Sequence, residues 1–436
     1  MPEPSTNGTA PTVAVVLPGG GARGAYEIGA MSVLLPALEA RGERVSVFCG
    51  TSVGAINAAL LASLADQSAD DRMATALERW GDLSKGDVIR PMVGLGLPVT
   101  LMRFIGEALE IPGVRLASLL DPTPLAASLD GWIDWVGLRR QIAQRRVKAV
   151  CVVATSLSRG GPVAFVDTRD EMPASGELEF MRVRLAGEHV RASAAIPMLF
   201  PPVEVTSPRP ARDHYIDGGT RLNTPIKPAL ALGADRVIVV GFEPFSGAGR
   251  LRERHVERPR LSDVAANVVD GLLVDQVGSD LHRMVSINSF FAEHASGGPS
   301  PAARAYRRSR GRPPYRRISY ALVSPETHGE IGRIAEDVFA RRYGGLRGLL
   351  SPDYPLLSRL LGGRTRSRGE LLSFLLFDKL FVAELIEAGQ RDAQRWLDRH
   401  PGFWCSDAAH DFDTGAYAMN GWRDDEALAE FRALRR

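Results

Sequence analysis

Residues 13–24 of this 436-residue chain read VAVVLPGGGARG. The first five residues are an unbroken apolar run, mostly β-branched, and this predicts a buried strand. The glycines that follow predict a tight loop, and the apolar spacing of residues 25–40 predicts a helix that ends near Gly42. Pro36 lacks the amide that would bond to Ser32, so we expect this helix to kink or restart there.

The same succession of strand, turn and helix comes again directly afterwards. Residues 44–49 are predicted to form a strand, residues 50–54 a tight turn and residues 55–64 a helix. The later apolar runs at 147–154 and 236–241 are continuous rather than alternating, which is typical of strands covered by helices on both faces. The chain is therefore predicted to be an α/β protein with a mainly parallel sheet.

Composition excludes several classes of protein. With 45% hydrophobic and 24% charged residues the chain is predicted to fold into a globular protein, and a net charge of +2 gives no reason to expect a nucleic-acid partner. Cys49, Cys151 and Cys405 are far apart in the sequence, so neither a disulfide framework nor a zinc site is expected. Because we find no secretory leader and no apolar run long enough to span a membrane, we expect a cytoplasmic location.

The chain is predicted to have four parts. These are a disordered lead at 1–11, an α/β core at 12–245 with an apolar insertion at 91–120, basic loops and one further strand at 246–325, and a helical region at 326–436. Within the last part, the apolar segment 371–386 contains charged residues and is interpreted as a buried helix rather than a membrane span.

Three segments have alternative interpretations. The insertion at 91–120 is either a helical segment packed on the core or a lid that contacts a bilayer. The arginine-rich segments at 247–259 and 304–317 are either solvated loops or sites of attraction to anionic lipid headgroups.

The glycine loop after the first strand is a candidate anion site. Its residues are Gly19, Gly20, Gly21, Ala22, Arg23 and Gly24. Successive amides and a helix N-terminus can converge there on a dinucleotide phosphate or on the oxyanion of an acyl-transfer reaction. A dinucleotide fold requires an acidic residue at the end of the second strand. That strand ends instead at Cys49 and is followed by Gly50, so a dinucleotide-dependent oxidoreductase is disfavoured.

The turn after the second strand contains a candidate nucleophile. The pattern Gly50-x-Ser52-x-Gly54 between a strand and a helix is typical of a nucleophile elbow, in which a sharp turn exposes the serine hydroxyl. Alone the pattern is weak, because glycine is common in this chain. The glycine loop on the preceding turn lies at the same carboxyl edge of the sheet, so we expect it to face Ser52.

The base that would activate this serine is not decided by the residues alone. His189, His214, His255, His282, His294 and His328 follow Ser52, and none of them lies in a recognisable motif. A predicted strand ends in Asp217, followed by Gly218 and Gly219, and this is either an ordinary Asp-Gly turn or a carboxylate held by backbone donors. Because His214 lies three residues before Asp217, we expect the two side chains to point to opposite faces.

Taken in order, the glycine loop, the elbow, the segment 192–202 and the Asp217-Gly218-Gly219 triplet resemble the patatin-like phospholipase family over about residues 13–240. The resemblance implies a three-layer patatin-like core. It also implies that Ser52 is the nucleophile and Asp217 the base, without a histidine. Amides around Gly20, Gly21 and Ala22 would then bind the oxyanion, and Arg23 would brace the loop. Pro18 departs from the family pattern, and residues beyond about 325 have no counterpart in it.

The function implied by the resemblance is hydrolysis of carboxylic esters of lipids or phospholipids, of the phospholipase A or lysophospholipase type. Acyl transfer by a serine and a carboxylate needs no metal and no organic cofactor, so none is expected. A lipid ester is the expected substrate, with peripheral contact to an anionic membrane at its inner face. A soluble carboxylesterase of the same fold, a non-catalytic membrane-binding member and a histidine-dependent esterase are the alternatives, and the oligomeric state is not predicted.

Overall fold

The computed structural model describes residues 10–83, 86, 90–91, 120–121, 123–176, 178–197, 200–244, 318–343 and 366–405. The strands are β1 (Val13–Leu17), β2 (Val45–Thr51), β3 (Arg90–Pro91), β4 (Leu120–Asp121), β5 (Ala149–Ser156), β6 (Pro162–Thr168), β7 (Glu179–Arg182), β8 (Val203–Val205), β9 (Asp213–Asp217), β10 (Arg236–Val240) and β11 (Ser319–Val323). The α-helices are α1 (Gly24–Glu39), α2 (Val53–Ser63), α3 (Ala69–Asp82), α6 (Thr123–Trp132), α7 (Trp135–Ala143), α8 (Gly187–Ser193), α9 (Ile226–Ala231), α13 (Glu330–Tyr343), α16 (Arg366–Leu375) and α17 (Lys379–Arg399). The short 3₁₀ helices are η1 (Gly21–Arg23), η2 (Arg209–Ala211) and η3 (Gly218–Thr220).

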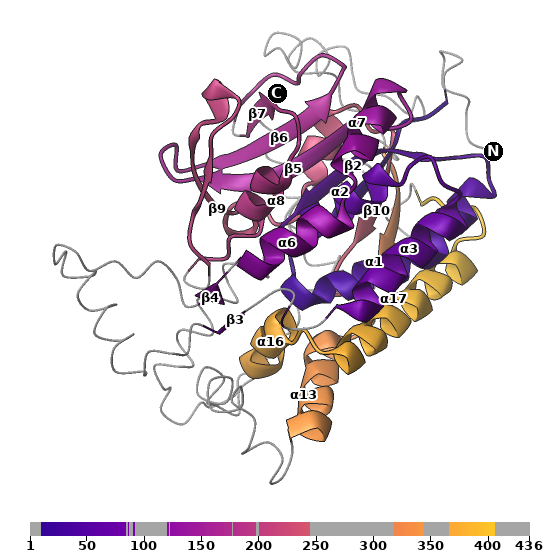
Figure 1. The fold of residues 1–436 in the computed structure, drawn as a ribbon. Helices are drawn as coiled ribbons and strands as arrows, with labels where there is room; N and C mark the ends of the chain where they lie inside the picture. The colour runs from indigo at the N-terminus through magenta and orange to yellow at the C-terminus, as the bar shows by residue number, and fades with distance from the viewer. Residues whose placement is uncertain are drawn as a thin grey trace, which may run out of the picture.

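One large sheet organises these elements (Figure 1). Its main path runs β11-β10-β1-β2-β5-β6-β7, and the neighbours from β11 to β5 are all parallel. β6 and β9 pair antiparallel with β5, and β8 pairs antiparallel with β9. The prediction of an α/β fold with a mainly parallel sheet is therefore confirmed.

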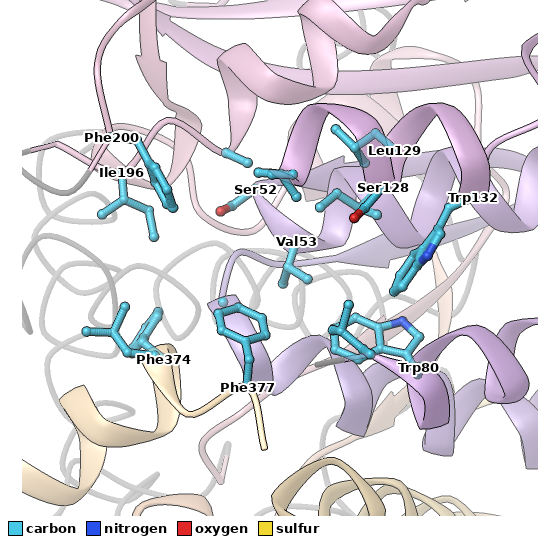
Figure 2. A pocket seen from close by; sticks show the side chains of 16 residues that line it. Ser52, Val53, Trp80, Ser128, Leu129, Trp132, Ile196, Phe200, Phe374 and Phe377 are labelled. Carbon is cyan, nitrogen blue, oxygen red and sulfur yellow. The ribbon is translucent and has the colours of Figure 1, made fainter. Parts of the chain in front are cut away.

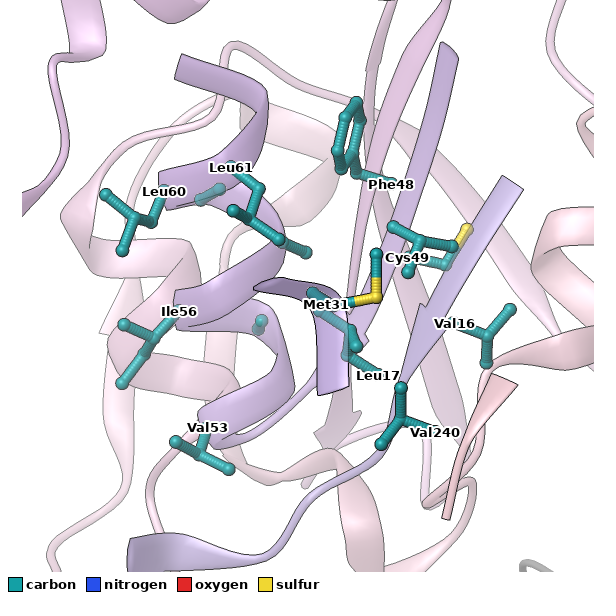
Figure 3. Packing of buried hydrophobic residues seen from close by; sticks show 14 of the residues in the cluster. Val16, Leu17, Met31, Phe48, Cys49, Val53, Ile56, Leu60, Leu61 and Val240 are labelled. Atoms are coloured by element: carbon teal, nitrogen blue, oxygen red, sulfur yellow. The ribbon is translucent and has the colours of Figure 1, made fainter. Parts of the chain in front are cut away.

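The centre of the sheet is covered on both faces. Every residue of β1 and of β5 is buried, as the continuous apolar runs predicted. Leu61 of α2 points toward β1 and β2, whereas Ile56 and Leu60 lie on the side of α2 that faces away from these strands (Figure 3). This packing fixes the start of α2 directly above the carboxyl ends of β1 and β2, where the turns with chemical groups lie.

The helical C-terminal region packs on the core, and α17 lies along α1 (Figure 1). Two glycines permit a close approach of the two backbones. A Cβ atom added at Gly29 would lie 2.2 Å from the carbonyl oxygen of Ile386, and one at Gly389 would lie 2.2 Å from that of Tyr26. The buried Tyr26 hydroxyl also donates a 2.6 Å hydrogen bond to Asp392. Helix α17 thus stabilises α1, the helix that follows the glycine loop.

Two details of the sequence-based prediction are wrong. α1 does not restart at Pro36, because it runs from Gly24 to Glu39 and the Ala40 amide still bonds to the Pro36 carbonyl at 2.9 Å. The apolar segment 371–386 is not one helix. Asp378 accepts a hydrogen bond from the Leu380 amide at 2.9 Å and so caps the start of a second helix.

Several predicted segments lie outside the described residues. They are most of the lead at 1–11, of the insertion at 91–120 and of the basic loops at 246–317. The division of the chain into four parts stays a prediction, although β11 joins the same sheet as β1. Among the described helices, none combines the length and the apolar character needed to cross a membrane.

Candidate active site

Ser52 lies at a strained turn between β2 and α2. Its backbone has φ 54° and ψ −123°, a conformation that residues with a side chain rarely adopt. The flanking glycines are required by close backbone contacts. A Cβ at Gly50 would lie 2.1 Å from the Gly54 carbonyl oxygen, and one at Gly54 would lie 2.1 Å from that of Leu17. The turn therefore has the geometry of a nucleophile elbow.

A second serine holds this turn in place. The Ser52 amide donates to the hydroxyl of Ser193 at 2.8 Å, and that hydroxyl donates to the Val153 carbonyl at 2.5 Å. Ser193 ends α8, so this helix connects the elbow to β5. Sequence analysis had placed Ser193 in a family motif without a role.

Asp217 ends β9, the strand that pairs with the carboxyl-terminal half of β5. Its side chain is buried, and its Oδ1 accepts a hydrogen bond from the Gly219 amide at 2.7 Å. Gly218 has no room for a side chain, because a Cβ there would lie 2.2 Å from the Val153 carbonyl oxygen. The Asp-Gly-Gly sequence thus holds a buried carboxylate with one backbone donor.

The second carboxylate oxygen of Asp217 differs from the first in its contacts. Oδ2 is buried, and no donor among the described residues meets the distance and angle limits of a hydrogen bond to it. Burial raises the pKa of Asp217 to about 6, while the neighbouring Ser52 hydroxyl and the Gly219 amide act in the opposite direction by stabilising the charged form. A carboxyl group with this pKa is charged near neutral pH and is basic enough to accept a proton.

The glycine loop borders Ser52 directly. A Cβ at Gly19 would lie 3.0 Å from the Ser52 Cβ and 2.6 Å from Asn223 Oδ1. Asn223 bonds to Gly19 in both directions, because its Oδ1 accepts from the Gly19 amide at 3.0 Å and its Nδ2 donates to the Gly19 carbonyl at 3.3 Å. No sequence signal distinguished Asn223 from other turn residues.

These bonds divide the amides of the loop into two groups. The amide of Gly19 donates to Asn223, that of Arg23 to the Gly20 carbonyl, and that of Gly24 to carbonyls of η1. The amides of Gly20, Gly21 and Ala22 come before the first intrahelical hydrogen bonds, and helix geometry leaves them without an acceptor. These three are therefore the amides of the loop to which the helix itself offers no acceptor.

An apolar pocket opens at Ser52 (Figure 2). It encloses about 650 Å³, including its open mouth. Its walls come from the elbow, α2, α3, α6, the segment after α8 and the C-terminal region, and they include Gly21, Ser52, Val53, Ile56, Trp80, Leu83, Leu125, Ser128, Leu129, Trp132, Ala194, Ile196, Phe200, Phe374, Leu375 and Phe377. The wall residues from α3, α6 and the C-terminal region were not predicted from sequence, although the apolar character of residues 371–386 was a signal that this segment is buried.

The described histidines are engaged elsewhere. The Nδ1 of the buried His189 accepts from the Ala186 amide at 3.2 Å, and its Nε2 lies 3.3 Å from the Ser207 carbonyl oxygen. His214 is exposed on β9, on the opposite face from the buried Asp217, as predicted. His328 pairs with Glu243. The candidates His255, His282 and His294 lie outside the described residues.

The site contains no metal-binding cluster within the part of the chain that the structure describes. Cys49 and Cys151 face each other on β2 and β5 and are buried in the core rather than in the pocket. Arg23 is also buried, beneath α16. The chemical groups brought together at the carboxyl edge of the sheet are therefore one hydroxyl, one carboxylate and a row of amides.

Comparison with known proteins gives short matches in sequence and distant ones in structure. Patatin-like phospholipase domain-containing protein 6 of Mus musculus is 39% identical over 100 residues, which are 23% of this chain and 7% of that protein. The Homo sapiens protein of the same name matches equally. The matched part is thus a small fraction of the length of these relatives.

Among solved structures, VipD from Legionella pneumophila is 15% identical with a TM-score of 0.33, covering 90% of this chain and 67% of that one. Human GIVD cytosolic phospholipase A2 is 13% identical with a TM-score of 0.31, covering 88% and 59%. Similarities at this level carry no argument about activity.

A family model described as patatin-like phospholipase matches residues 15–230. The matched residues include the glycine loop, the elbow and Asp217. The chain therefore belongs to the patatin-like phospholipase family.

Proposed function

We propose that this protein is a lipid acyl hydrolase in which Ser52 is the nucleophile and Asp217 the general base. The observation that carries the proposal is the position of Ser52. Its strained elbow opens on an apolar pocket and lies beside a buried carboxylate whose pKa is about 6. Membership of the patatin-like phospholipase family supports hydrolysis of lipids in general.

The first half of the reaction is acylation. Oδ2 of Asp217 takes the proton of the Ser52 hydroxyl while Oγ attacks the ester carbonyl carbon. The amides of Gly20, Gly21 and Ala22 stabilise the negative charge that develops on the carbonyl oxygen. When the tetrahedral intermediate collapses, the carbon–oxygen bond to the alcohol breaks, Asp217 returns the proton to that alcohol, and Ser52 keeps the acyl group.

Deacylation repeats these steps with water. Asp217 takes a proton from the attacking water, the same amides bind the oxyanion, and Ser52 leaves with the proton as the fatty acid is released. Each half-reaction thus ends with Asp217 in its starting form. No metal or organic cofactor has a step in this proposal.

The pocket indicates the part of the substrate that it holds. Apart from Ser52, Ser128 and the Gly21 backbone, its wall is made of apolar side chains, which match a hydrocarbon chain and offer little to a polar headgroup. We propose that the acyl chain occupies this space, with the alcohol part toward the mouth. A phospholipase A, a lysophospholipase and an esterase for short acyl groups all present the same carbonyl to Ser52.

Peripheral contact with an anionic membrane and a cytoplasmic location are further proposals. The membrane contact rests on the basic and apolar segments of the sequence rather than on the described residues. Binding to vesicles with and without phosphatidylserine tests the contact. Activity on soluble esters without any vesicle binding would favour a soluble carboxylesterase of this fold.

Product identification tests the function. Purified wild-type protein and Ser52→Ala protein are incubated with a mixture of phospholipids, lysophospholipids and acylglycerols, and released products are identified by mass spectrometry. We expect free fatty acid from wild type and none above background from the variant. Vesicle binding without hydrolysis by wild type would instead favour the non-catalytic member.

A further inference from the structure

Helix α16 lies directly on the glycine loop, about 350 residues later in the chain. Arg23 of η1 makes the connection and is only 1% exposed. Its Nε donates to the Ser373 hydroxyl at 2.7 Å, and a terminal guanidinium nitrogen donates to the Glu370 carbonyl at 3.0 Å. The same nitrogen forms an ion pair with the Glu370 carboxylate, and the guanidinium lies 4.2 Å from the centre of the Phe374 ring.

The backbone of the loop also touches α16. Gly21 has φ +58°, a left-handed conformation that favours glycine. A Cβ atom at Gly21 would lie 2.2 Å from the Phe374 carbonyl oxygen, so the loop and the helix are in backbone contact at this point. Any displacement of α16 would therefore free both the side chain of Arg23 and the backbone of Gly21.

A buried guanidinium is costly unless charged and polar partners surround it. Among the described residues, Glu370 is the carboxylate that forms an ion pair with Arg23. Glu243 lies near enough to interact with both charges, but its carboxylate is hydrogen-bonded to His328 at 2.9 Å. The charge that holds Arg23 in the buried position thus comes from α16.

The position of Arg23 in the chain links this contact to the chemistry. Arg23 directly follows the Gly20, Gly21 and Ala22 amides, and its own amide closes the turn by donating to the Gly20 carbonyl at 3.1 Å. A shift of Arg23 moves this turn, and a displacement of an ångström at an oxyanion site reduces catalysis strongly.

We propose that α16 positions the oxyanion loop, with Glu370 and Ser373 acting on it through Arg23. This role rests on the proposed acyl hydrolase function. Glu370 and Ser373 are positioning residues, because they contact Arg23 and not the substrate. Helix α16, which would have this positioning role, lies beyond the region matched by the family model.

The test compares wild type with Glu370→Gln, Glu370→Asp and Ser373→Ala. The control is Glu384→Gln, because Glu384 also pairs with an arginine between C-terminal helices but contacts Arg341 on α13 rather than the loop. The measurements are kcat and KM for a short soluble ester, the inhibition constant of a trifluoromethyl ketone, and the melting temperature. The ketone carbon bonds to Ser52 Oγ while the proton passes to Asp217, and its oxyanion occupies the site of the transition-state charge.

We expect kcat to fall about 10- to 100-fold in Glu370→Gln and about 3- to 10-fold in Ser373→Ala, with KM within about threefold. The inhibition constant of the ketone should rise by a similar factor, Glu370→Asp should recover part of the loss, and Glu384→Gln should stay within about twofold of wild type. A purely structural role would lower the melting temperature without this paired change in kcat and inhibition.

The inference would be overturned if Ser373→Ala and every folded Glu370 variant kept kcat and the ketone inhibition constant within about twofold of wild type. If Glu370→Gln does not fold, the Ser373→Ala values decide alone. Failure of the proposed function is a different result, because wild type would then show no Ser52-dependent hydrolysis, and the positioning role would fall with it.

Discussion

The hydroxyl of Ser193 accepts a hydrogen bond from the amide of Ser52 at 2.8 Å, although 141 residues separate the two in the chain. Because Ser193 also donates to the Val153 carbonyl, it connects the nucleophile turn to the centre of the sheet. We expect Ser193→Ala to leave the buried Ser52 amide without an acceptor, at a cost of about 1–3 kcal/mol in unfolding free energy. We also expect kcat to fall about tenfold as the turn loosens.

Ser63→Ala is the matched control for this variant. Ser63 is also buried, but its hydroxyl bonds only to the Leu60 carbonyl of its own helix at 2.7 Å. Urea unfolding and ester kinetics are measured for both proteins. Equal kcat values for the two variants would show that the Ser193 contact does not hold the nucleophile.

The pH dependence of hydrolysis follows from the burial of Asp217. Its pKa is raised to about 6 by desolvation, and a general base must be deprotonated. We expect log kcat/KM to rise with a slope of about one below pH 6 and to level off above it. A rate profile that is flat from pH 5 to 8 on a soluble ester would contradict this assignment of the base.

The raised pKa also means that the profile alone does not distinguish Asp217 from a histidine, whose unperturbed pKa is about 6.5. Substitution of His189 and His214 makes this distinction. Neither histidine contacts Ser52 or Asp217 in the described structure. Both alanine variants should therefore keep the same apparent pKa, and their kcat should stay within a few-fold of wild type. Loss of the general base would instead lower kcat by roughly 10²-fold or more.

Asp217→Asn should stabilise the protein while it abolishes activity. Burial raises the pKa of Asp217 from 3.8 to about 6 in the folded state. The contribution of Asp217 to the unfolding free energy is therefore fully present below its unfolded pKa, and it is lost as pH rises to its folded pKa. Removing the charge should therefore raise the unfolding free energy by about 3 kcal/mol at pH 8 and by less than about 1 kcal/mol at pH 4. Chemical denaturation at the two pH values measures the difference. A variant less stable than wild type at pH 8 would mean that interactions in the native state compensate the charge of this carboxylate.

The elements that carry the chemistry were predictable from sequence because each has a local signal. Val13–Leu17 and the glycines after it, the elbow around Ser52 and the strand that ends in Asp217 all lie where residue patterns placed them. The supports of the site were not predictable in the same way. Asn223 and Ser193 act through contacts across 204 and 141 residues, and the packing of Phe374 on the pocket depends on how α16 docks.

The far end of the pocket should set the preferred length of the acyl chain. Trp80 and Trp132 meet there edge to face (Figure 2), with ring centres 5.8 Å apart. The indole nitrogen of Trp80 also donates a 2.9 Å hydrogen bond to Asn57. We expect Trp132→Ala to extend the space available to a chain. Each additional buried methylene contributes about 0.8 kcal/mol, so kcat/KM for longer chains should rise about fourfold per methylene relative to wild type.

Trp135→Ala is the control for Trp132, because Trp135 packs on the core without lining the pocket. A series of p-nitrophenyl esters of increasing chain length gives kcat/KM for each protein. If both variants keep the wild-type preference, the two tryptophans do not limit the chain.

If Ser52 is the covalent nucleophile of an acyl hydrolase, a serine-directed inhibitor should trap it. The most direct measurement is reaction of the native protein with a long-chain fluorophosphonate, followed by mass spectrometry of the intact chain and of its peptides, with Ser52→Ala as the reference. We expect one adduct, on Ser52, complete loss of hydrolysis on labelling, and no adduct on the variant. Labelling of Ser52→Ala at the wild-type rate, or hydrolysis that persists in fully labelled protein, would contradict this role of Ser52.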